Sequence, residues 1–294
     1  MTNSDPACPT LYLVATPIGN LADVTRRAAE VLRAVDAVAA EDTRHSRKLL
    51  EHLGIRNKPL YSIESHVSAS RLDRLIERIA DGMSTALVTD AGTPGISDPG
   101  ARVVRAARTA GIRVVVVPGP SALTAAVATS GLVEGPFFFA GFLPRQGAKR
   151  RAALDRICRC SEPVVLFESP LRVQATLQDL AREQPDRKAA ICRELTKLHE
   201  EVVLDPLSVL AVRENPWRGE IVLVLSACTI GAPDQGTLEP EPDDAELAQA
   251  LGQGKTVRDL VRDSGTRGER RRELYGRLVA LSKQSRGSDD RGRR

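Results

Sequence analysis

Aromatic residues and long apolar runs are both scarce in this chain of 294 residues. Phe, Trp and Tyr make up 3% of it, so a core must be built from Ala, Val, Leu and Ile. No apolar run approaches the roughly 18 residues of a membrane span. The polar first residues, up to Pro9, have neither the basic nor the apolar region of a signal peptide. We therefore expect a cytoplasmic protein with no membrane partner.

Cysteine is rare as well. The chain has an odd number of cysteines at scattered positions: Cys8, Cys158, Cys160, Cys192 and Cys228. Cys158 and Cys160 lack a second cysteine pair or a histidine at the spacing of a zinc site. The sequence therefore predicts reduced thiols and no bound metal.

Charge of both signs is present but unevenly placed. The net charge of +4 mildly favours an anionic partner. Residues 231–249 contain six acidic residues and no Lys or Arg, whereas residues 264–294 contain ten Lys or Arg and four Asp or Glu. An acidic spacer before a basic end indicates a separate C-terminal module.

Short apolar runs alternate with helical patterns, which is typical of an α/β fold. In the first half we expect strands at 11–16, 37–40, 60–63, 85–89 and 113–117, with helices at 23–35, 43–53, 70–80 and 99–110. In the second half we expect strands at 137–142, 164–167, 189–192, 202–204 and 220–225. The last two are predicted to pair antiparallel, because their connection has little room for a crossover helix.

The segment Pro118-Gly119-Pro120 is the strongest break in the first half. We place a domain boundary there. The predicted organisation is an N-terminal α/β domain at 10–119, a C-terminal α/β domain at 120–229, an acidic linker at 230–244 and a small basic helical module at 245–284.

Three glycine-bearing turns, at 16–20, 90–95 and 118–121, directly follow predicted strands. In open α/β sheets ligands bind at the carboxyl ends of the strands, and glycine lets the backbone approach a ligand closely. The three turns together predict one shared ligand site. The first turn lacks the G-x-G-x-x-G pattern of a dinucleotide site.

Basic residues near the strand ends are candidates for phosphate contacts. They are Arg44, Arg47, Arg145, Lys149, Arg150 and Arg151, joined by Arg270 and Arg271 in the C-terminal module. The alternatives are a solvated basic surface, and a helix cap at Asp42 or Thr43. Residues 193–197 and 218–220 hold Arg, Lys and Glu that form either a buried ion-pair network or the wall of a crevice.

Glu64 and His66 follow the third predicted strand and are the candidates for a general base. A carboxylate or an imidazole at that edge of the sheet would lie close to a ligand bound by the glycine turns.

Seven segments together resemble the family of ribosomal RNA small-subunit methyltransferase I. They occur in the family's order and spacing, and the resemblance covers about residues 10–228. The segments are LYLVATPIGNLAD at 11–23, AEDTRH at 40–45, DAGTP at 90–94, PGP at 118–120, GFLP at 141–144, FES at 167–169 and RELTK at 193–197.

The resemblance implies a class III, or tetrapyrrole-methylase-like, fold in which two α/β domains enclose S-adenosylmethionine (SAM), usually in a homodimer. It implies 2′-O-methylation of a cytidine in the decoding region of 16S rRNA, in the small ribosomal subunit. The implied SAM pocket contains Pro17, Ile18, Gly19, Asp90, Gly92, Thr93, Pro94, Ile96, Ser121, Ala122, Phe167, Cys192 and Gly219.

The chain departs from the family pattern at three places. Phe167 stands where relatives often have Tyr, Arg218 where Lys is common, and Glu64-Ser65-His66-Val67 where a His-x-His-Asn segment is usual. Two other functions fit the sequence: methylation of a small corrin precursor by the same fold, and a non-catalytic role in RNA binding or ribosome assembly.

Reversing the charge of Arg270, Arg271 and Arg272 to Glu is expected to weaken RNA binding, because the basic end would then repel phosphates. The affinity for SAM should stay the same. Filter binding with rRNA and calorimetry with SAM measure the two effects separately, and an unchanged RNA affinity would refute the assignment.

Overall fold

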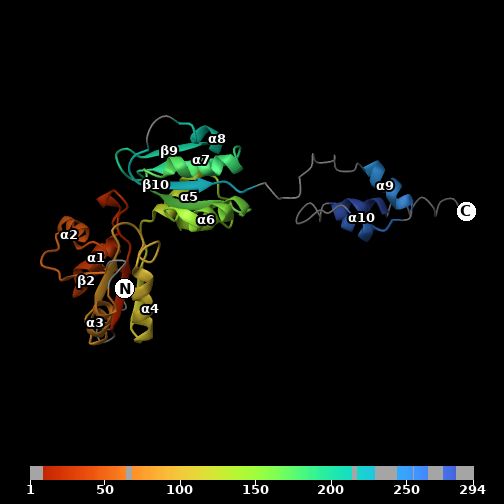
Figure 1. Ribbon diagram of the computed structural model, residues 1–294. Coiled ribbons are helices and arrows are strands. Elements are labelled where there is room, and N and C mark those ends of the chain that lie inside the picture. Colours follow the sequence, from red (N-terminus) through yellow and green to blue (C-terminus); the bar gives the residue numbers. More distant parts are fainter. Residues whose placement is uncertain are drawn as a thin grey trace, which may run out of the picture. The chain divides into compact units, whose positions relative to one another are not determined.

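The computed structural model describes residues 9–63, 68–213, 217–228, 244–253, 255–263 and 274–282. The chain forms two compact units, Met1–Ile230 and Gly231–Arg294. The first unit contains two five-stranded sheets with helices on their faces, and the second unit is helical where it is described (Figure 1). The α/β class predicted from the sequence is confirmed.

The first sheet is entirely parallel. Its strands are β1 (Thr10–Val14), β2 (Ala37–Ala40), β3 (Leu60–Ser62), β4 (Thr85–Val88) and β5 (Arg113–Val117), in the order β3-β2-β4-β1-β5. Each lies within two residues of its predicted position. Since all five strands run in one direction, their carboxyl ends meet at one edge of the sheet, where the predicted glycine turns follow.

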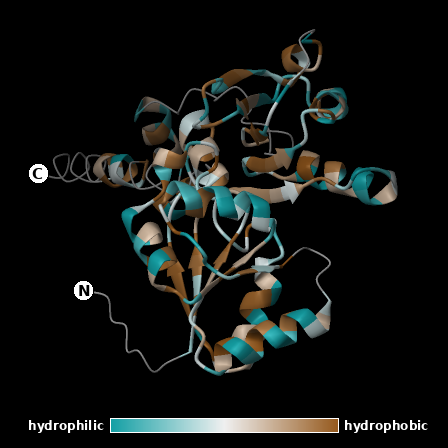
Figure 2. Cartoon of the chain, turned by 90° about the vertical axis from the view of Figure 1, so that its left-hand side faces the viewer, coloured by the Kyte–Doolittle hydropathy of each residue, from teal (hydrophilic) through white to brown (hydrophobic). Residues whose placement is uncertain are grey.

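Two pairs of helices cover the faces of this sheet. Helices α1 (Arg26–Ala34) and α2 (Thr43–His52) pack on one face, and α3 (Ala69–Ala80) and α4 (Gly100–Thr109) pack on the other. Figure 2 shows apolar strands flanked by helices of mixed hydropathy. Helix α1 begins later than predicted because the 3-10 turn η1 (Leu21–Asp23) precedes it and the Thr25 side chain accepts a hydrogen bond from the Ala28 amide as the cap.

The second sheet is mixed. Its strands are β6 (Phe138–Phe142), β7 (Val164–Glu168), β8 (Lys188–Arg193), β9 (Glu201–Pro206) and β10 (Ile221–Leu225), in the order β6-β7-β10-β8-β9. Strands β6 and β7 are parallel, and every other neighbouring pair is antiparallel.

The predicted antiparallel pairing of the last two strands is wrong. Strand β10 lies between β7 and β8, whereas β9 pairs with the other side of β8, so β9 and β10 run parallel without touching. The reason is burial. All five residues of β10 are buried and suit an interior position, whereas β9 leaves Val202 and Leu204 exposed and suits an edge.

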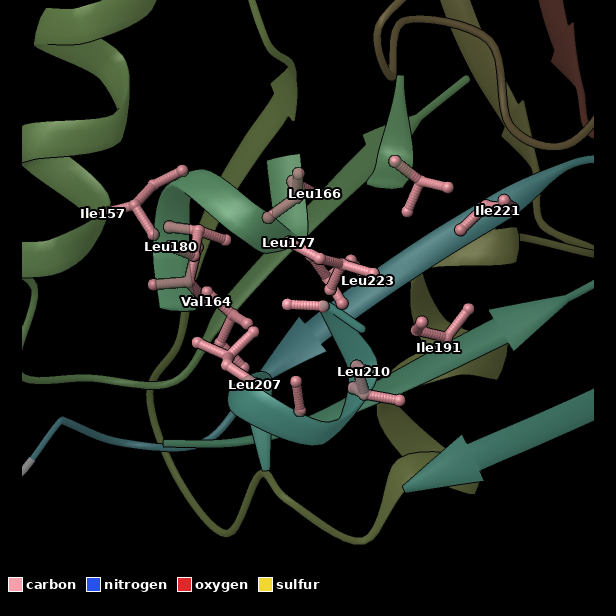
Figure 3. Close-up of a cluster of buried hydrophobic side chains, with 14 of the residues drawn as sticks. Ile157, Val164, Leu166, Leu177, Leu180, Ile191, Leu207, Leu210, Ile221 and Leu223 are labelled. Carbon is pink, nitrogen blue, oxygen red and sulfur yellow. The ribbon is translucent and has the colours of Figure 1, made fainter. Parts of the chain in front are cut away.

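Helices also cover both faces of the second sheet. Helices α6 (Gly147–Arg159), α7 (Val173–Glu183) and α8 (Leu207–Leu210) enclose the core drawn in Figure 3, where Leu177 lies beside Leu223 of β10. Helix α5 (Ala122–Ser130) packs on the opposite face. The chain therefore passes from the first sheet to the second near the predicted boundary at 119, which itself stays a prediction.

The second unit contains α9 (Asp244–Gly252), α10 (Val257–Asp263) and a helical segment at 274–282. Their apolar side chains form a small core of their own around Leu247, Val261, Leu274 and Leu278. Residues 229–243, where the acidic linker is predicted, lie outside the described residues, so the linker and module boundaries stay predictions. Within the described part of the chain, no helix is both long and apolar enough to cross a membrane.

The buried guanidinium of Arg187 ties four segments of the second sheet together. It donates to the carbonyls of Ser226 (2.8 Å), Ile157 (3.1 Å) and Glu162 (3.3 Å) and to the side-chain oxygen of Gln184 (2.9 Å). These acceptors belong to the ends of β10, α6 and α7 and to the loop before β7. A single cation thus satisfies backbone groups that a tightly packed end of the sheet would otherwise leave without partners.

Replacing Arg187 with Met is expected to lower the free energy of unfolding by about 2–4 kcal/mol, since buried carbonyls lose their donor. Arg182→Met on α7 is the matched control. Its side chain is 71% exposed, and its loss should change stability by about 0.5 kcal/mol or less. Urea denaturation measures both, and equal midpoints for the two variants would contradict the role assigned to Arg187.

Candidate functional site

The three glycine turns of the first sheet are joined by hydrogen bonds. Thr16 and Gly92 form an isolated bridge, with Thr16 N donating to Gly92 O (2.9 Å) and Gly92 N donating to Thr16 O (3.0 Å). Thr93 Oγ1 donates to the carbonyl of Pro120 at 3.3 Å. The turns that follow β1, β4 and β5 therefore meet at one place, as their common position at strand ends predicted.

A cavity of about 400 Å³ lies where these turns face the second sheet. Its volume falls in the range of roughly 300–1,000 Å³ that is typical of small-molecule sites. The first sheet contributes Ile18, Glu41, Thr89, Asp90, Ala91, Gly92, Thr93, Ile96, Ser97 and Asp98, followed by Ser121 and Ala122 at the start of α5. The second sheet and its loops contribute Phe142, Phe167, Glu168, Ser169, Pro170, Cys192, Leu195, Gly219, Glu220, Ile221 and Val222.

Most of the residues predicted for the SAM pocket line this cavity. These are Ile18, Asp90, Gly92, Thr93, Ile96, Ser121, Ala122, Phe167, Cys192 and Gly219. Pro17 is buried and does not line it. Pro94 lines a small recess that shares Glu41 and Asp98 with the cavity. Gly19 lies instead against the loop after β8, where an added Cβ would stand 2.5 Å from Cγ of Lys197.

Gly92 is one position where the site requires glycine. Its φ of +83° is in the left-handed region that L residues avoid. A Cβ there would reach ordinary contact distance, 3.5 Å from Ile18 Cγ2 and 3.7 Å from the Pro120 carbonyl, so the backbone conformation rather than space requires glycine. The turn after β4 can therefore pack against both other turns and still keep its backbone on the cavity.

Three carboxylates of the first sheet form an acidic side of the cavity. Glu41 accepts a hydrogen bond from Thr89 Oγ1 (3.1 Å), Asp90 accepts one from the Asp42 amide (2.9 Å), and Asp98 accepts from the amides of Gly95 and Gly100. Partial burial raises the pKa of Glu41, and the negative charges of Asp90 and Asp98 raise it further. Glu41 thus holds a proton more readily than an ordinary glutamate.

No role was predicted for Glu41, because its segment was interpreted either as a helix cap or as a phosphate contact through Arg44 and Arg47. The signal was available: Glu41 directly follows β2, and the carboxyl end of a parallel strand lies at the ligand edge of the sheet. The predicted helix cap is present as well, since the Asp42 side chain accepts a hydrogen bond from the Arg44 amide at 2.8 Å.

Phenylalanine rings and Cys192 form an apolar part of the opposite wall, beside Glu168 and Glu220. The ring of Phe167 lies 5.1 Å from that of Phe139 and 5.3 Å from that of Phe142, measured between centroids. Cys192 is fully buried, and burial raises the pKa of its thiol to about 11. At neutral pH the thiol is therefore uncharged and acts as part of this apolar wall.

Arg150 is directed inward, which corrects its predicted contact with RNA. Its guanidinium donates to Asp179 (3.0 Å) and Thr176 (3.1 Å) and lies 3.8 Å from the buried carboxylate of Glu168. Arg172 pairs with the same Glu168 carboxylate at 2.6 Å. Because only 12% of the Arg150 side chain is exposed, its charge serves this buried network rather than an external phosphate.

The other predicted RNA contacts that are described, Arg44, Arg47, Arg145, Lys149 and Arg151, are exposed. Arg44 pairs with Asp42 at 2.9 Å, and its hydrogen bonds lower the pKa of Asp42 to about 2. Glu64, His66, Arg270 and Arg271 lie outside the described residues. Their roles stay predictions.

Both alternatives for residues 193–197 and 218–220 hold in part. Lys197 pairs with Glu194 (2.8 Å) and with Glu220 (3.4 Å), which makes an ion-pair network. Gly219 and Glu220 also line the cavity. Gly219 has a φ of +80°, and a side chain there would overlap the Glu194 carboxylate, so the network and the cavity wall are built together.

The class of this protein follows from its similarity to a known family. Residues 10–211 match the model of the family described as Tetrapyrrole (Corrin/Porphyrin) Methylases. The fold is shared with diphthine synthase (TM-score 0.59, 19% identity, 74% of this chain and 90% of that one). It is also shared with cobalt precorrin-4 methyltransferase (TM-score 0.58, 16% identity, 77% and 98%). The fold is that of a class III methyltransferase.

More similar relatives share a single name, ribosomal RNA small subunit methyltransferase I. The protein of Xylella fastidiosa is 46% identical over 231 residues, which is 77% of this chain and 83% of the relative. That of Mesorhizobium japonicum is 41% identical over 292 residues, 98% of this chain and 97% of the relative. The chain belongs to the tetrapyrrole methylase family and, within it, to the family of ribosomal RNA small subunit methyltransferase I.

The cofactor of this family is SAM, and the cavity suits it. A solved uroporphyrin-III C-methyl transferase from Thermus thermophilus, complexed with S-adenosyl homocysteine, has the same fold (TM-score 0.54, 19% identity, 74% of this chain and 97% of that one). In this chain the apolar wall suits an adenosine ring, and the carboxylates suit a ligand that carries hydroxyl, amino and sulfonium groups. The described residues include no group of three or more His, Cys, Asp or Glu that could hold a metal ion.

Glu41→Gln is expected to raise the free energy of unfolding at neutral pH. The pKa of Glu41 is raised in the folded chain, so ionisation of this carboxyl group stabilises the unfolded chain more than it stabilises the folded chain. The wild type therefore loses stability relative to the variant as the pH rises above the unfolded value of about 4.3. Below that value the two should be equally stable.

Urea denaturation between pH 4 and pH 8 tests this. Glu51→Gln, at an exposed position on α2, is the control for the loss of one carboxylate. A Glu41→Gln variant that is less stable than the wild type at pH 7 would show that the folded chain stabilises the ionised carboxylate, which would contradict a raised pKa.

Proposed function

We propose that this protein transfers the methyl group of SAM to the ribose 2′-hydroxyl of a cytidine in the decoding region of 16S rRNA. The observation that carries the proposal is the cavity at the joined glycine turns, in a chain at least 40% identical to proteins named for small-subunit rRNA methylation. The choice of a cytidine and of its 2′-oxygen is supported by the family resemblance of the seven sequence segments. A ribose hydroxyl as acceptor would itself separate RNA from DNA.

The residues of the cavity have separate tasks in this reaction. When bound, SAM supplies a methyl group on a positively charged sulfur. Ile18, Ala122 and Phe167 exclude water from the donor, and Asp90 with Thr93 orients its polar groups. The chain must hold the acceptor oxygen about 3–3.5 Å from the methyl carbon and in line with the sulfur.

The acceptor hydroxyl also has to lose its proton. Glu64 and His66 remain the candidates proposed from the sequence, and Glu41 is a further one because it lines the cavity and its pKa is raised. A base with a pKa closer to neutrality accepts a proton more effectively than a fully solvated carboxylate. Positioning is expected to contribute more to the rate than this proton transfer.

The rRNA backbone would lie on the exposed basic residues. Arg44, Arg47, Arg145, Lys149 and Arg151 are exposed in the first unit, and Arg270 and Arg271 belong to the basic C-terminal module. Contacts of this kind hold phosphates without reading sequence. We further propose a homodimer, the arrangement usual in the resembled family, and a division of the first unit into domains at residue 119.

Methylation of a corrin precursor is the rival within the same fold. The solved methyltransferases of corrin and porphyrin substrates are 16–21% identical to this chain, a likeness that concerns the fold. The relatives named for rRNA are 40–46% identical. The rRNA substrate is therefore the better supported of the two.

Methyl transfer from labelled SAM to purified 16S rRNA and to small ribosomal subunits tests the proposal. Label is expected on one cytidine 2′-oxygen, located by mass spectrometry, and an RNA with deoxycytidine at that position should take none. Gly92→Val should abolish both SAM binding and transfer, because valine resists the positive φ and would crowd Ile18. Label on uroporphyrinogen but on neither RNA substrate would replace the proposal with its rival.

A further inference from the structure

Strand β6 contains a β-bulge just before it reaches the cavity. Along β7 its partners are Phe138 with Val164 and Phe139 with Val165, and then Gly141 with Leu166 and Phe142 with Phe167. Ala140 is thus the additional residue in the register. Gly141 takes a φ of +63°, the left-handed conformation that glycine adopts at such bulges.

The bulge decides which face of the sheet Phe142 occupies. Phe138 and Ala140 pack into the core under α6 and α7, whereas Phe139 packs on the α5 side with Phe167. Side chains alternate along a regular strand, so Phe142 would follow Phe138 and Ala140 into the buried core. The additional residue shifts the alternation by one, and Phe142 lies beside Phe167 at the cavity instead.

As a result, a large aromatic side chain stays 57% exposed at the cavity. Its ring is tilted by 56° to that of Phe167, which in turn meets Phe139 edge to face. The inner two rings hold the outer one in place. Burial of a phenylalanine is favourable, and aromatic residues are scarce in this chain. A strand register that leaves one exposed at a ligand site is therefore expected to serve a bound partner with an apolar flat face.

The surroundings favour an uncharged flat partner over a phosphate. The bulge lies against the turn after β4, where a Cβ on Gly141 would stand 3.3 Å from Ser97 Oγ, and the next residue, Asp98, lines the same cavity. Together with Glu41 and Asp90, Asp98 makes this side of the cavity acidic, which repels phosphate. A nucleobase has a flat face for stacking, and a cytosine has an amino group that carboxylates accept from.

We propose that Phe142 is the platform on which the base of the target nucleotide stacks after it leaves the RNA strand. The stacked base would place its own ribose at the mouth of the cavity. Recognition of single-stranded RNA commonly uses unstacked bases lying on aromatic side chains. This inference rests on the proposed function and adds the residue that positions its substrate.

Phe142→Ala is the test. The loss of one base–aromatic stack corresponds to about a 10- to 100-fold loss of affinity, so kcat/KM for the RNA should fall by about that factor. The dissociation constant for SAM, measured by calorimetry, should not change. Phe142→Tyr and Phe142→Trp, which keep a flat ring, should retain most of the activity.

Phe137→Ala is the matched control. Phe137 is also partly exposed and lies five residues earlier, but it does not line the cavity, so its loss should leave transfer unchanged. A fluorescent cytosine analogue at the target position gives a direct signal. Its emission should change on binding to the wild type and to Phe142→Trp, and much less on binding to Phe142→Ala.

Three results would overturn the inference. The first is an unchanged kcat/KM in Phe142→Ala. The second is a parallel loss of SAM affinity, which would assign the ring to the donor site. The third is a loss of transfer that accompanies a change of oligomeric mass, which would assign the ring to a subunit interface. A wild type that methylates no RNA would instead defeat the proposed function, so the two failures are distinguishable.

Discussion

The pair of backbone hydrogen bonds between Thr16 and Gly92 is the constraint on which the site depends. It closes the carboxyl edge of a parallel sheet by joining the turns after β1 and β4, and the Pro120 carbonyl joins the third turn through Thr93. Without these bonds, three separate loops would end at that edge. With these hydrogen bonds, the backbones of the three turns form one continuous surface that a small cofactor can contact.

The second sheet completes the cavity with different means. Its fully buried strand β10 takes the interior position, and the ion pairs of Lys197 and the buried Glu168 hold the loops at its end. The two walls therefore differ in chemistry: the first sheet contributes three carboxylates, and the second contributes a phenylalanine cluster beside carboxylates that are paired with Arg172 and Lys197. That difference suits a reaction in which a cationic donor and an uncharged base meet in one cavity.

Much of the first sheet could be predicted because parallel buried strands are continuous apolar runs and each is followed by its own turn. The pairing of β9 and β10 could not, since strand order depends on which strand buries best rather than on which is next in the chain. Arg150 was misplaced for a related reason: a basic loop looks the same in sequence whether its arginine faces solvent or Glu168.

The sequence by itself determined the strands of both sheets, the helices of the first sheet, the positions of the glycine turns and the family, because these depend on local pattern and on order along the chain. Only the tertiary structure decided that Glu41 lies in a partly desolvated site and that a bulge turns Phe142 toward the cavity. The physical reason is that burial and side-chain direction arise from neighbours distant in sequence. One additional residue in a strand moves every later side chain to the opposite face of the sheet, and the apolar pattern of the sequence does not mark where this happens.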